Sequence, residues 1–489
     1  MALTVGVAVV VLSRLVSAGG EYVAGPIAGT LVHTLPTVLL TWAVATFGGY
    51  AETLFALTAA GLAAGLFALL TALIRSIVSQ FGTDLDWIEA VATVAGVALL
   101  AGLLTGSPTH AIGLGLVAGA VVWLVDRFDR PSGSAGRWSR RDVVSALGGG
   151  LFAGFGALAA SASTDTAAPE LSLPDRTRRE IEELQNVAKA RELDVSGLDG
   201  LLTPVEEFYT VDINIDPPAV DAEAWSVSVK GAVDTEFELT RDRLDLFDPV
   251  SELLTLRCIA EEMNAIRIGT AVWTGLPVAA LLDRAGPNGE YVKLVAADRY
   301  SEVVPIEMLD DALLVYAMNG RALPREHGFP ARIIVPGTWG KVNVKWVSGI
   351  EVLTEEEEGF WSEWAGTSSV NTVAKLWQAN PTEDGMELAG HAYAGPRGIS
   401  AVEVSTDGGD SWNEATLSEP LPHAATWRQW RYEWTPERDS VEVVVRAIDG
   451  EGQLQPEEYS KPKPDGATGW VSRRVETTET TDFTSGYRN

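Results

Sequence analysis

Cysteine is almost absent from this chain of 489 residues, in which Cys258 is the single thiol. A lone thiol excludes an internal disulfide and any zinc or iron–sulfur site built from several cysteines. Histidine is also scarce, at five residues, so sites that need several imidazole ligands are disfavoured as well. An isolated cysteine is most often a small buried apolar residue, so its sequence context must decide whether Cys258 has a chemical role.

Positive charge is the second scarce feature. The chain has 36 Lys and Arg against 66 Asp and Glu, a net charge of −30, and only eight of the basic residues are lysines. Such an excess of carboxylates repels nucleic acid, so no nucleic-acid partner is expected. Because 46% of the residues are apolar and 16 are tryptophan, the acidity does not indicate disorder. We interpret it as a salt-adapted surface of the halophilic type.

Long apolar runs distinguish residues 1–161 from the rest. Runs of helical length occur at 2–18, 52–74, 87–105, 109–126 and 143–161. Each is near the ~20 residues that cross a ~30 Å hydrocarbon core, so the sequence predicts an α-helical transmembrane region of about five helices. The stretch 19–51, which contains Pro26 and Pro36, is apolar without a clear helical pattern.

Basic residues set the expected orientation of these helices. Five arginines lie between residues 127 and 141 and Arg75 follows the second run, whereas the loops 19–51 and 106–108 carry no Lys or Arg. This pattern predicts a multi-pass protein of the cell membrane whose part after residue 161 lies outside the cytoplasm. Residues 139–144 also resemble a twin-arginine export signal, although ordinary positive-inside anchoring explains them equally well.

The remaining sequence divides into four further parts. Residues 162–202 are a polar linker with the pattern of a surface helix at 173–193. Residues 203–366 alternate strands and short helices, which is typical of an α+β domain. Residues 367–470 contain short, evenly spaced strands that favour an immunoglobulin-like β-sandwich, and the polar tail 471–489 is expected to be frayed.

A series of short motifs surrounds and follows the thiol. In order they are Thr255-Leu256-Arg257-Cys258, Trp273-Thr274-Gly275-Leu276-Pro277, Met318-Asn319-Gly320, His327-Gly328-Phe329-Pro330-Ala331-Arg332, Val335-Pro336-Gly337 and Val344-Lys345-Trp346. The series resembles the molybdopterin domain of the sulfite oxidase family, and with the sandwich the resemblance covers roughly residues 203–470. It implies a molybdenum–molybdopterin cofactor with the Cys258 thiolate bound to the metal. Without the family's haem domain and with apolar runs ahead of the catalytic part, the membrane-anchored branch fits best.

The resemblance also implies a set of cofactor-binding residues. His327 and Arg332 match a histidine and an arginine that contact the pterin. Cations suit the phosphate of the pterin, and Lys341 and Lys345 cluster with Arg332 in an otherwise acidic chain. Gly337 falls in a turn where backbone could approach the cofactor closely.

Three further cofactor contacts have weaker support. Tyr209 and Asp212 belong to a segment that resembles the opening of the family's pterin site, and either could instead be a packing or turn residue. Asp298 matches a position near the cofactor. Trp273 is expected to be a core aromatic residue.

Two carboxylates follow the thiol where the family's sulfite oxidases differ. Those enzymes have two arginines at the positions of Glu262 and Met263. Glu261 and Glu262 would place negative charge near the metal, which repels a doubly charged anion unless cations intervene. Sulfite is therefore a doubtful substrate, and a neutral sulfoxide is electrostatically easier. Either glutamate could relay protons if burial raised its pKa; otherwise both face solvent.

These patterns together predict a molybdenum-dependent oxidoreductase. It would perform two-electron oxygen-atom transfer on a small sulfur-containing or other oxo-accepting or oxo-donating substrate, with an external electron carrier. The resemblance implies a homodimer formed through the sandwich. Two alternatives remain open: a membrane-anchored, non-catalytic scaffold with the cofactor fold, and a transport protein, which is disfavoured because the apolar runs contain almost no charges.

The acidic surface generates the first prediction. We expect the midpoint temperature of unfolding to rise steadily from low salt to multimolar salt, because counterions screen repulsion among the carboxylates. Thermal scans across a salt series measure this. A protein that is fully stable without salt would contradict the salt-adapted interpretation.

Overall fold

The fold is described from a computed structural model covering residues 50–80, 86–105, 173–213, 217–362 and 369–487, together with positions 114, 116, 118 and 364. The chain divides into two compact units. Unit 1 contains residues 1–167 and Asp212–Pro217, and unit 2 contains Ala168–Val211 and Pro218–Asn489. Each unit is considered by itself below.

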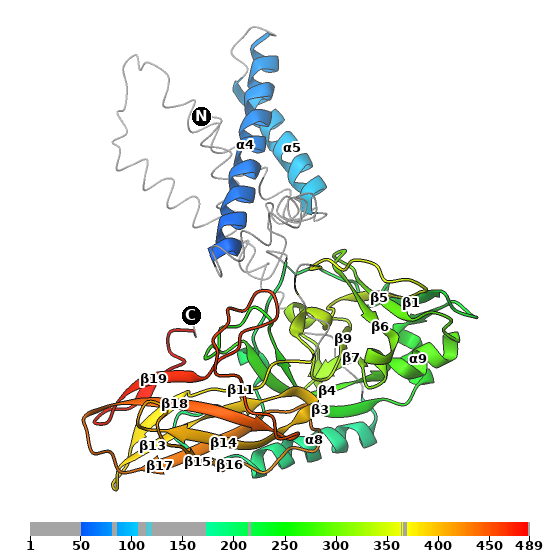
Figure 1. Cartoon of the computed structure of the whole chain (residues 1–489). Helices are drawn as coiled ribbons and strands as arrows, with labels where there is room; N and C mark the ends of the chain where they lie inside the picture. The colour runs from blue at the N-terminus through cyan, green and yellow to red at the C-terminus, as the bar shows by residue number, and fades with distance from the viewer. Residues whose placement is uncertain are drawn as a thin grey trace, which may run out of the picture. The chain divides into compact units, whose positions relative to one another are not determined.

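Two long apolar helices make up most of the described part of unit 1: α4 (Tyr50–Gln80) and α5 (Asp86–Thr105) (Figure 1). Small residues allow them to approach closely, since a Cβ on Gly96 would lie 2.8 Å from Ile74 Cδ1. Phe67 and Val97 are fully buried, whereas Leu69 is 68% exposed. One face of this pair is therefore packed while large apolar side chains cover the other.

The described residues do not support the predicted multi-span region, because only one of their helices is long and apolar enough to cross a membrane. The predicted runs 52–74 and 87–105 coincide with α4 and α5. In the described segments, the stretch Leu57–Ile74 is long and apolar enough to cross a membrane, and Val91–Ala101 is a shorter apolar helix. The predicted runs 2–18 and 143–161, and most of 109–126, lie outside the described residues.

A mixed five-stranded sheet opens the first domain of unit 2, with the order β2-β1-β10-β5-β6. Its edge strands are β2 and β6, β1 pairs with β10 in parallel, and the other pairs are antiparallel. Alternation builds β1, where Val227 and Val229 are fully buried between half-buried serines. The strands are β1 (Ser226–Gly231), β2 (Phe237–Thr240), β5 (Tyr291–Ala296), β6 (Ser301–Pro305) and β10 (Val347–Leu353).

A second five-stranded sheet carries the thiol. Its order is β3-β4-β7-β8, with β9 also paired to β7. Nine of the ten residues of β4 are buried, which identifies it as a strand covered on both faces. The amphipathic helix α9 (Val278–Ala285) follows β4 directly and ends at Gly286, whose positive φ of 68° suits a helix C-cap. The strands are β3 (Val250–Arg257), β4 (Ile268–Pro277), β7 (Leu313–Met318), β8 (Arg321–Ala322) and β9 (Arg332–Ile334).

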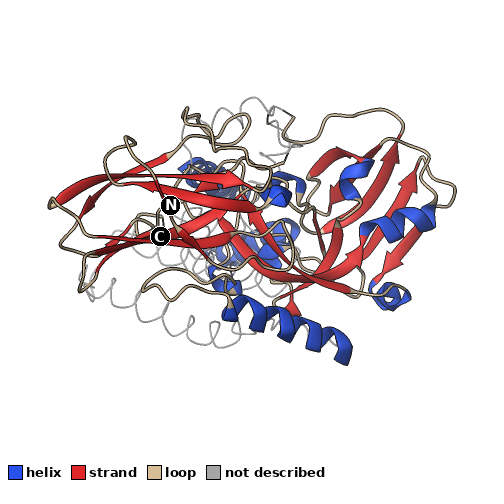
Figure 2. Ribbon diagram, turned by 60° about the horizontal axis from the view of Figure 1, so that its bottom comes forward, coloured by secondary structure: helices blue, strands red, loops and turns tan. Residues whose placement is uncertain are grey.

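Two antiparallel sheets form the second domain of unit 2, and strands dominate both domains (Figure 2). Their apolar faces share one core that includes Leu388, Trp430, Val404 and Val445, as a β-sandwich requires. One sheet contains β11 (Val373–Ala374), β12 (Gln378–Pro381), β13 (Met386–Tyr393), β16 (Thr416–Leu417), β17 (Arg428–Trp434) and β20 (Thr481–Asp482). The other contains β14 (Ile399–Ser405), β15 (Asn413–Glu414), β18 (Ser440–Asp449) and β19 (Val471–Glu476).

The frayed tail predicted after residue 470 is wrong. Strand β19 pairs with β18 over six residues, and β20 pairs with β12. Val471 and Val475 are buried in the sandwich core, so their alternation within a polar sequence was the signal for a strand.

The predicted linker helix is present as α8 (Asp175–Ala190), which lies against β3 and β4 in unit 2 (Figure 1). Its residues Ile181 and Ala188, and Leu201 beyond it, are buried in the same core as the sandwich. The described part of the predicted linker is therefore packed along the catalytic unit.

Candidate functional site

Cys258 lies immediately after β3, at the beginning of the loop that joins β3 to β4. Arg257 pairs with Ile268, and the Cys258 amide donates a hydrogen bond of 3.0 Å to the Arg267 carbonyl. The thiol is 7% exposed. Opposed residues in an antiparallel pair project to the same face, so Cys258 and Arg267 share one face, while Arg257 and Ile268 share the other.

The surroundings of the thiol act on its pKa in opposite directions. Burial raises the pKa of Cys258, and Glu261 adds to this effect. Arg267 and Arg257 act against it by favouring the thiolate. Metal coordination deprotonates a thiol, so a bound metal ion would convert Cys258 to its thiolate.

Gly340 allows an aromatic residue to approach the thiol. Trp339 forms a bridge with Arg257, which brings Gly340 beside Cys258. A Cβ on Gly340 would lie 3.2 Å from the Tyr209 hydroxyl and 3.6 Å from Cys258 Cα. Burial raises the pKa of Tyr209 well above its usual value, and the charge of Arg332 opposes this. Tyr209 therefore connects the thiol with the basic residues of the 327–332 segment.

Arg332 and His327 form the basic side of the site. Arg332 donates from Nη1 to the His327 carbonyl at 3.0 Å and from Nη2 to the Asn343 carbonyl at 3.1 Å. Its buried Nε has no hydrogen-bond partner in the described part of the chain. Burial lowers the pKa of His327 to about 4, with Arg332 and Lys345 acting in the same direction, so the imidazole is neutral at neutral pH.

Lys345 lies close to this pair because Gly328 has no side chain. Gly328 has a φ of 112°, and a Cβ there would meet Arg332 Cβ at 3.0 Å and Lys345 Cβ at 3.3 Å. The Lys345 ammonium donates to the Glu326 carbonyl at 3.0 Å and lies 4.4 Å from the centre of the Trp346 ring. The structure therefore brings Cys258, Tyr209, His327, Arg332 and Lys345 into one neighbourhood.

Two residues predicted to bind the cofactor have other partners. Lys341 is 3.4 Å from the Glu302 carboxylate and donates to the Trp364 carbonyl at 2.9 Å. A Cβ on Gly337 would lie 2.2 Å from Pro396 Cδ, so this glycine makes room for the sandwich. These contacts give both residues a structural role, and their contact with the pterin stays a prediction.

Two other predicted residues, Asp298 and Glu262, also have protein partners of their own. The Asp298 carboxylate accepts a hydrogen bond of 3.0 Å from the Tyr300 amide and shapes the turn between β5 and β6. Asp212 belongs to unit 1, so its place in the site stays a prediction. Glu262 is exposed and accepts a hydrogen bond of 3.0 Å from the Tyr459 hydroxyl, which gives it a surface contact.

The expectation that Glu261 faces solvent or adds free negative charge is wrong. Its carboxylate is 0% exposed and lies 2.9 Å from Arg257 Nε and 3.0 Å from Lys375 Nζ. Two cations thus surround one carboxylate, and the electrostatic objection to an anionic substrate loses its basis at this residue.

Sequence reasoning missed Arg267 and Tyr300. Arg267 is exposed, and in the described segments its guanidinium makes no hydrogen bond or ion pair. The pairing of β3 with β4 around the loop was the signal that it faces the thiol. The Tyr300 hydroxyl lies 2.7 Å from a Glu302 carboxylate oxygen and 2.8 Å from the Lys341 carbonyl, and it can donate its proton to either one. Burial raises the pKa of Tyr300 well above its usual value, and the charges of Glu302 and Cys258 act in the same direction. Trp273 is fully buried, as expected of a core residue.

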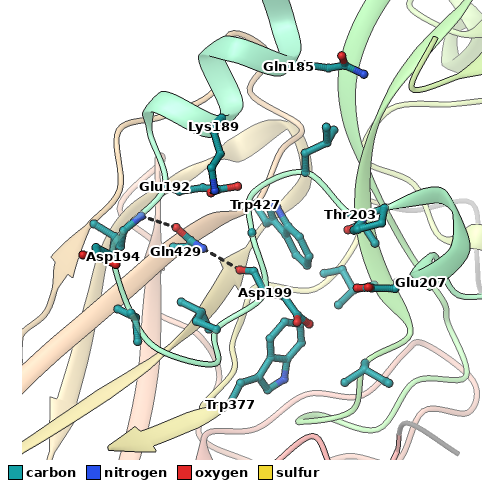
Figure 3. Close-up of a pocket in the computed structure, with 18 residues that line it drawn as sticks. Gln185, Lys189, Glu192, Asp194, Asp199, Thr203, Glu207, Trp377, Trp427 and Gln429 are labelled. Atoms are coloured by element: carbon teal, nitrogen blue, oxygen red, sulfur yellow. Dashed lines mark hydrogen bonds and ion pairs between the residues drawn. The ribbon is translucent and has the colours of Figure 1, made fainter.

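A cavity of about 610 Å³ lies on the other face of this hairpin (Figure 3). Ile266 and Ile268 line it together with Trp377, Trp427 and residues of the α8 segment. Since Arg267 stands between these two isoleucines and projects to the opposite face, the cavity is separate from the thiol site.

Comparison with known proteins identifies the family. A model of the oxidoreductase molybdopterin-binding domain matches residues 214–361, and a model of the Mo-co oxidoreductase dimerisation domain matches residues 367–462. Sulfite oxidase from Arabidopsis thaliana is 26% identical over 52% of this chain and 82% of its own length. This chain contains the catalytic and dimerisation domains of the sulfite oxidase family. It is a molybdopterin-dependent oxidoreductase.

Other proteins are also similar to this chain, two of them over shorter parts of their own length. Mitochondrial sulfite oxidase from Mus musculus is 29% identical over 53% of this chain and 58% of its own length. The NADH nitrate reductase of Solanum lycopersicum is 27% identical over 53% of this chain and 36% of its own length. The fold is similar to that of the sulfane dehydrogenase SoxCD from Paracoccus pantotrophus, with a TM-score of 0.50, 18% identity, and coverage of 65% of this chain and 94% of that chain.

The described residues of this sulfite oxidase-family enzyme fit the molybdenum cofactor. The thiol of Cys258 offers one soft ligand. The unpartnered Nε of Arg332 and the cations of the same cluster suit an anionic group of the pterin. Cys258 would hold the metal, while Tyr209, His327, Arg332 and Lys345 would hold the pterin.

The orphaned guanidinium nitrogen generates the second prediction. Replacement Arg332→Met should lower the affinity for molybdopterin by about 10- to 100-fold, because a charge-assisted hydrogen bond to the cofactor is lost. Pterin and molybdenum content after dialysis, measured by fluorescence and elemental analysis, report the change.

Arg428 offers a matched control. It donates to the carbonyls of Ile399 and Ser418, and its Nε also has no hydrogen-bond partner in the described part of the chain. Arg428→Met should lower stability without changing cofactor content. Equal cofactor loss in the two variants would show that Arg332 acts only through the fold.

Proposed function

We propose that this enzyme performs two-electron oxygen-atom transfer on a small oxyanion of sulfur. The observation that carries the proposal is the pairing of the Cys258 thiol with the exposed cation Arg267 on one face of the β3–β4 hairpin. When bound, molybdenum supplies the two-electron oxygen-atom chemistry, as in cofactor enzymes generally. The protein positions the metal through Cys258 and attracts the anion through Arg267.

Two further points support an anionic substrate. Arg257 and Lys375 neutralise Glu261, so the charged groups described around the thiol are cationic in sum. The names of the related enzymes, sulfite oxidase and nitrate reductase, also refer to small oxyanions. Sulfite is therefore a better candidate than the sequence suggested.

We also propose that the enzyme is anchored in the membrane with its catalytic unit outside the cytoplasm. The apolar length of Leu57–Ile74 supports an anchor, and the distribution of arginines in the sequence supports the orientation. An external carrier would then exchange electrons with the metal. The match to a dimerisation domain supports a homodimer formed through the sandwich. The −30 net charge supports a halophilic source.

The third prediction tests the metal ligand. Replacement Cys258→Ser should abolish turnover and molybdenum binding, because an alcohol is a much poorer ligand for this soft site than a thiolate. The fold should survive, since the two side chains are similar in size. Elemental analysis and circular dichroism measure the two effects.

The control for this variant is Met386→Leu, which replaces a buried sulfur-containing side chain in the sandwich core at nearly constant volume. It should keep full metal content. A Cys258→Ser protein that retains molybdenum and turnover would overturn the assignment, and a wild-type protein that folds without metal would favour the non-catalytic scaffold.

The fourth prediction tests the substrate class. Replacement Arg267→Met should lower kcat/KM for sulfite by about 10- to 100-fold, mainly through KM, because a charge-assisted contact to the anion is lost. Turnover of an uncharged sulfoxide with an artificial electron donor should not fall. Steady-state kinetics with an artificial acceptor or donor measure both.

The exposed residue Arg243 supplies the control, since Arg243→Met removes the same charge from a 3-10 turn outside the site. Its kinetic constants should match those of the wild type. The anionic class is rejected if Arg267→Met leaves the KM for sulfite unchanged, or if the wild type turns over the sulfoxide alone.

A further inference from the structure

The ammonium group of a lysine from the sandwich contacts the loop that contains the thiol. Lys375 lies between β11 and β12, and its side chain is 0% exposed. Its ammonium donates to the carbonyls of Met263 at 3.2 Å and Ala265 at 2.8 Å and lies 3.0 Å from the Glu261 carboxylate. All three partners belong to the β3–β4 loop, seven residues or fewer after Cys258.

Lys375, Glu261 and Arg257 form a buried charge triad. Arg257 Nε and Lys375 Nζ approach the same oxygen of Glu261, Oε2, and all three side chains are fully buried. The triad has two positive charges and one negative charge, so its sum is positive. An uncompensated buried charge is strongly destabilising, which means that a negative group nearby must offset it.

A thiolate at Cys258 would supply such a negative group. Glu261 donates its amide to the Cys258 carbonyl at 3.2 Å, and the charges of both Arg257 and Glu261 act on the Cys258 thiol. The other oxygen of Glu261, Oε1, and Arg257 Nη2 have no hydrogen-bond partner among the residues described. Attraction between opposite charges therefore holds the triad together, since two of its polar atoms make no hydrogen bond among the residues described. The net positive charge of the triad complements a thiolate bound to metal.

Further contacts fix this loop to the sandwich. Asn264 donates to the Leu376 carbonyl at 2.7 Å and accepts from the Leu376 amide at 2.9 Å. Arg257 Nη1 donates to the Asn371 carbonyl at 2.9 Å, and the Tyr393 hydroxyl donates to the Thr255 carbonyl at 2.9 Å. The domain that matches a dimerisation model thus contacts both sides of the segment containing the thiol.

We propose that Lys375 is a positioning residue of the molybdenum site, which acts through Glu261 to hold the Cys258 loop and to set the electrostatic potential at the thiolate. The sandwich then contributes a positioning residue to each catalytic site, in addition to any role in dimerisation. This inference rests on Cys258 being the metal ligand. Removal of Lys375 leaves Arg257 and Glu261 balanced, so the metal centre loses stabilisation of its reduced, more negative state.

Removing the charge of Lys375 and removing the charge of Glu261 should shift the reduction potential of molybdenum in opposite directions. Lys375→Met removes a positive charge and should lower the midpoint potential of molybdenum. Glu261→Gln removes a negative charge and should raise it. The double variant has the wild-type net charge and should return towards the wild-type potential. A residue with only a packing role would not produce this pattern of signs.

Turnover and pH dependence supply independent readouts. Replacing a residue that orients a metal ligand without binding the metal typically lowers activity by about 10- to 100-fold. We expect a loss of turnover in this range for Lys375→Met. Burial lowers the pKa of Lys375 to about 8, while Glu261 opposes this and Arg257 adds to it. The wild-type potential should therefore fall as pH rises through about 8, and this step should be absent in Lys375→Met and weakened in Lys375→Arg, which retains its charge.

The fifth prediction is measured by redox titration of the metal-loaded full chain, followed by the spectroscopic signal of molybdenum. Arg446→Met is the matched control, because it removes a cation paired with Glu403 at 2.7 Å in the other sheet of the sandwich. The control should change stability without moving the potential.

Two results would overturn the proposal: equal potentials in the wild type, Lys375→Met and Glu261→Gln, or shifts of the same sign in the two single variants. If Lys375→Met does not fold, Glu261→Gln and the double variant still decide the sign. Failure of the metal assignment is recognised separately, because the wild-type protein would then contain no molybdenum to titrate.

Discussion

The pairing of β3 with β4 is the constraint on which the site depends. Eight consecutive residue pairs, from Val250 with Gly275 to Arg257 with Ile268, leave no freedom in the register. The register places Cys258 opposite Arg267 on one face and turns Arg257 towards the sandwich on the other. A slip by one residue would exchange these faces and separate both side chains from their present partners.

Charge is distributed very differently between the surface and this site. The chain has a net charge of −30, yet the buried neighbourhood of the thiol combines Arg257, Lys375 and Arg332 with the carboxylate of Glu261. Buried charges interact more strongly than exposed ones, because little solvent screens them. A few cations in the interior can therefore govern the local potential in a protein whose surface has the opposite sign.

Much of the architecture could be predicted, because local patterns determine it. The surface helix predicted at 173–193 contains α8, and the evenly spaced strands predicted within 367–470 form the sandwich. The ordered motifs were enough to select Cys258, His327, Arg332 and Lys345. Burial and partner identity were not predictable, since they depend on segments far apart in the chain. Glu261 faces a lysine 114 residues later, and Gly337 is constrained by Pro396 of the sandwich.

The last strands of the chain have a consequence for how this protein is handled. β19 covers the edge of β18 and β20 covers the edge of β12, so one short segment closes a border of each sandwich sheet. A chain cut before Val471 would expose two rows of unpaired amides and carbonyls, which recruit strands from other molecules. Truncation before Val471 would thus favour aggregation, and a sandwich damaged in this way could no longer hold Lys375 against the loop that contains Cys258.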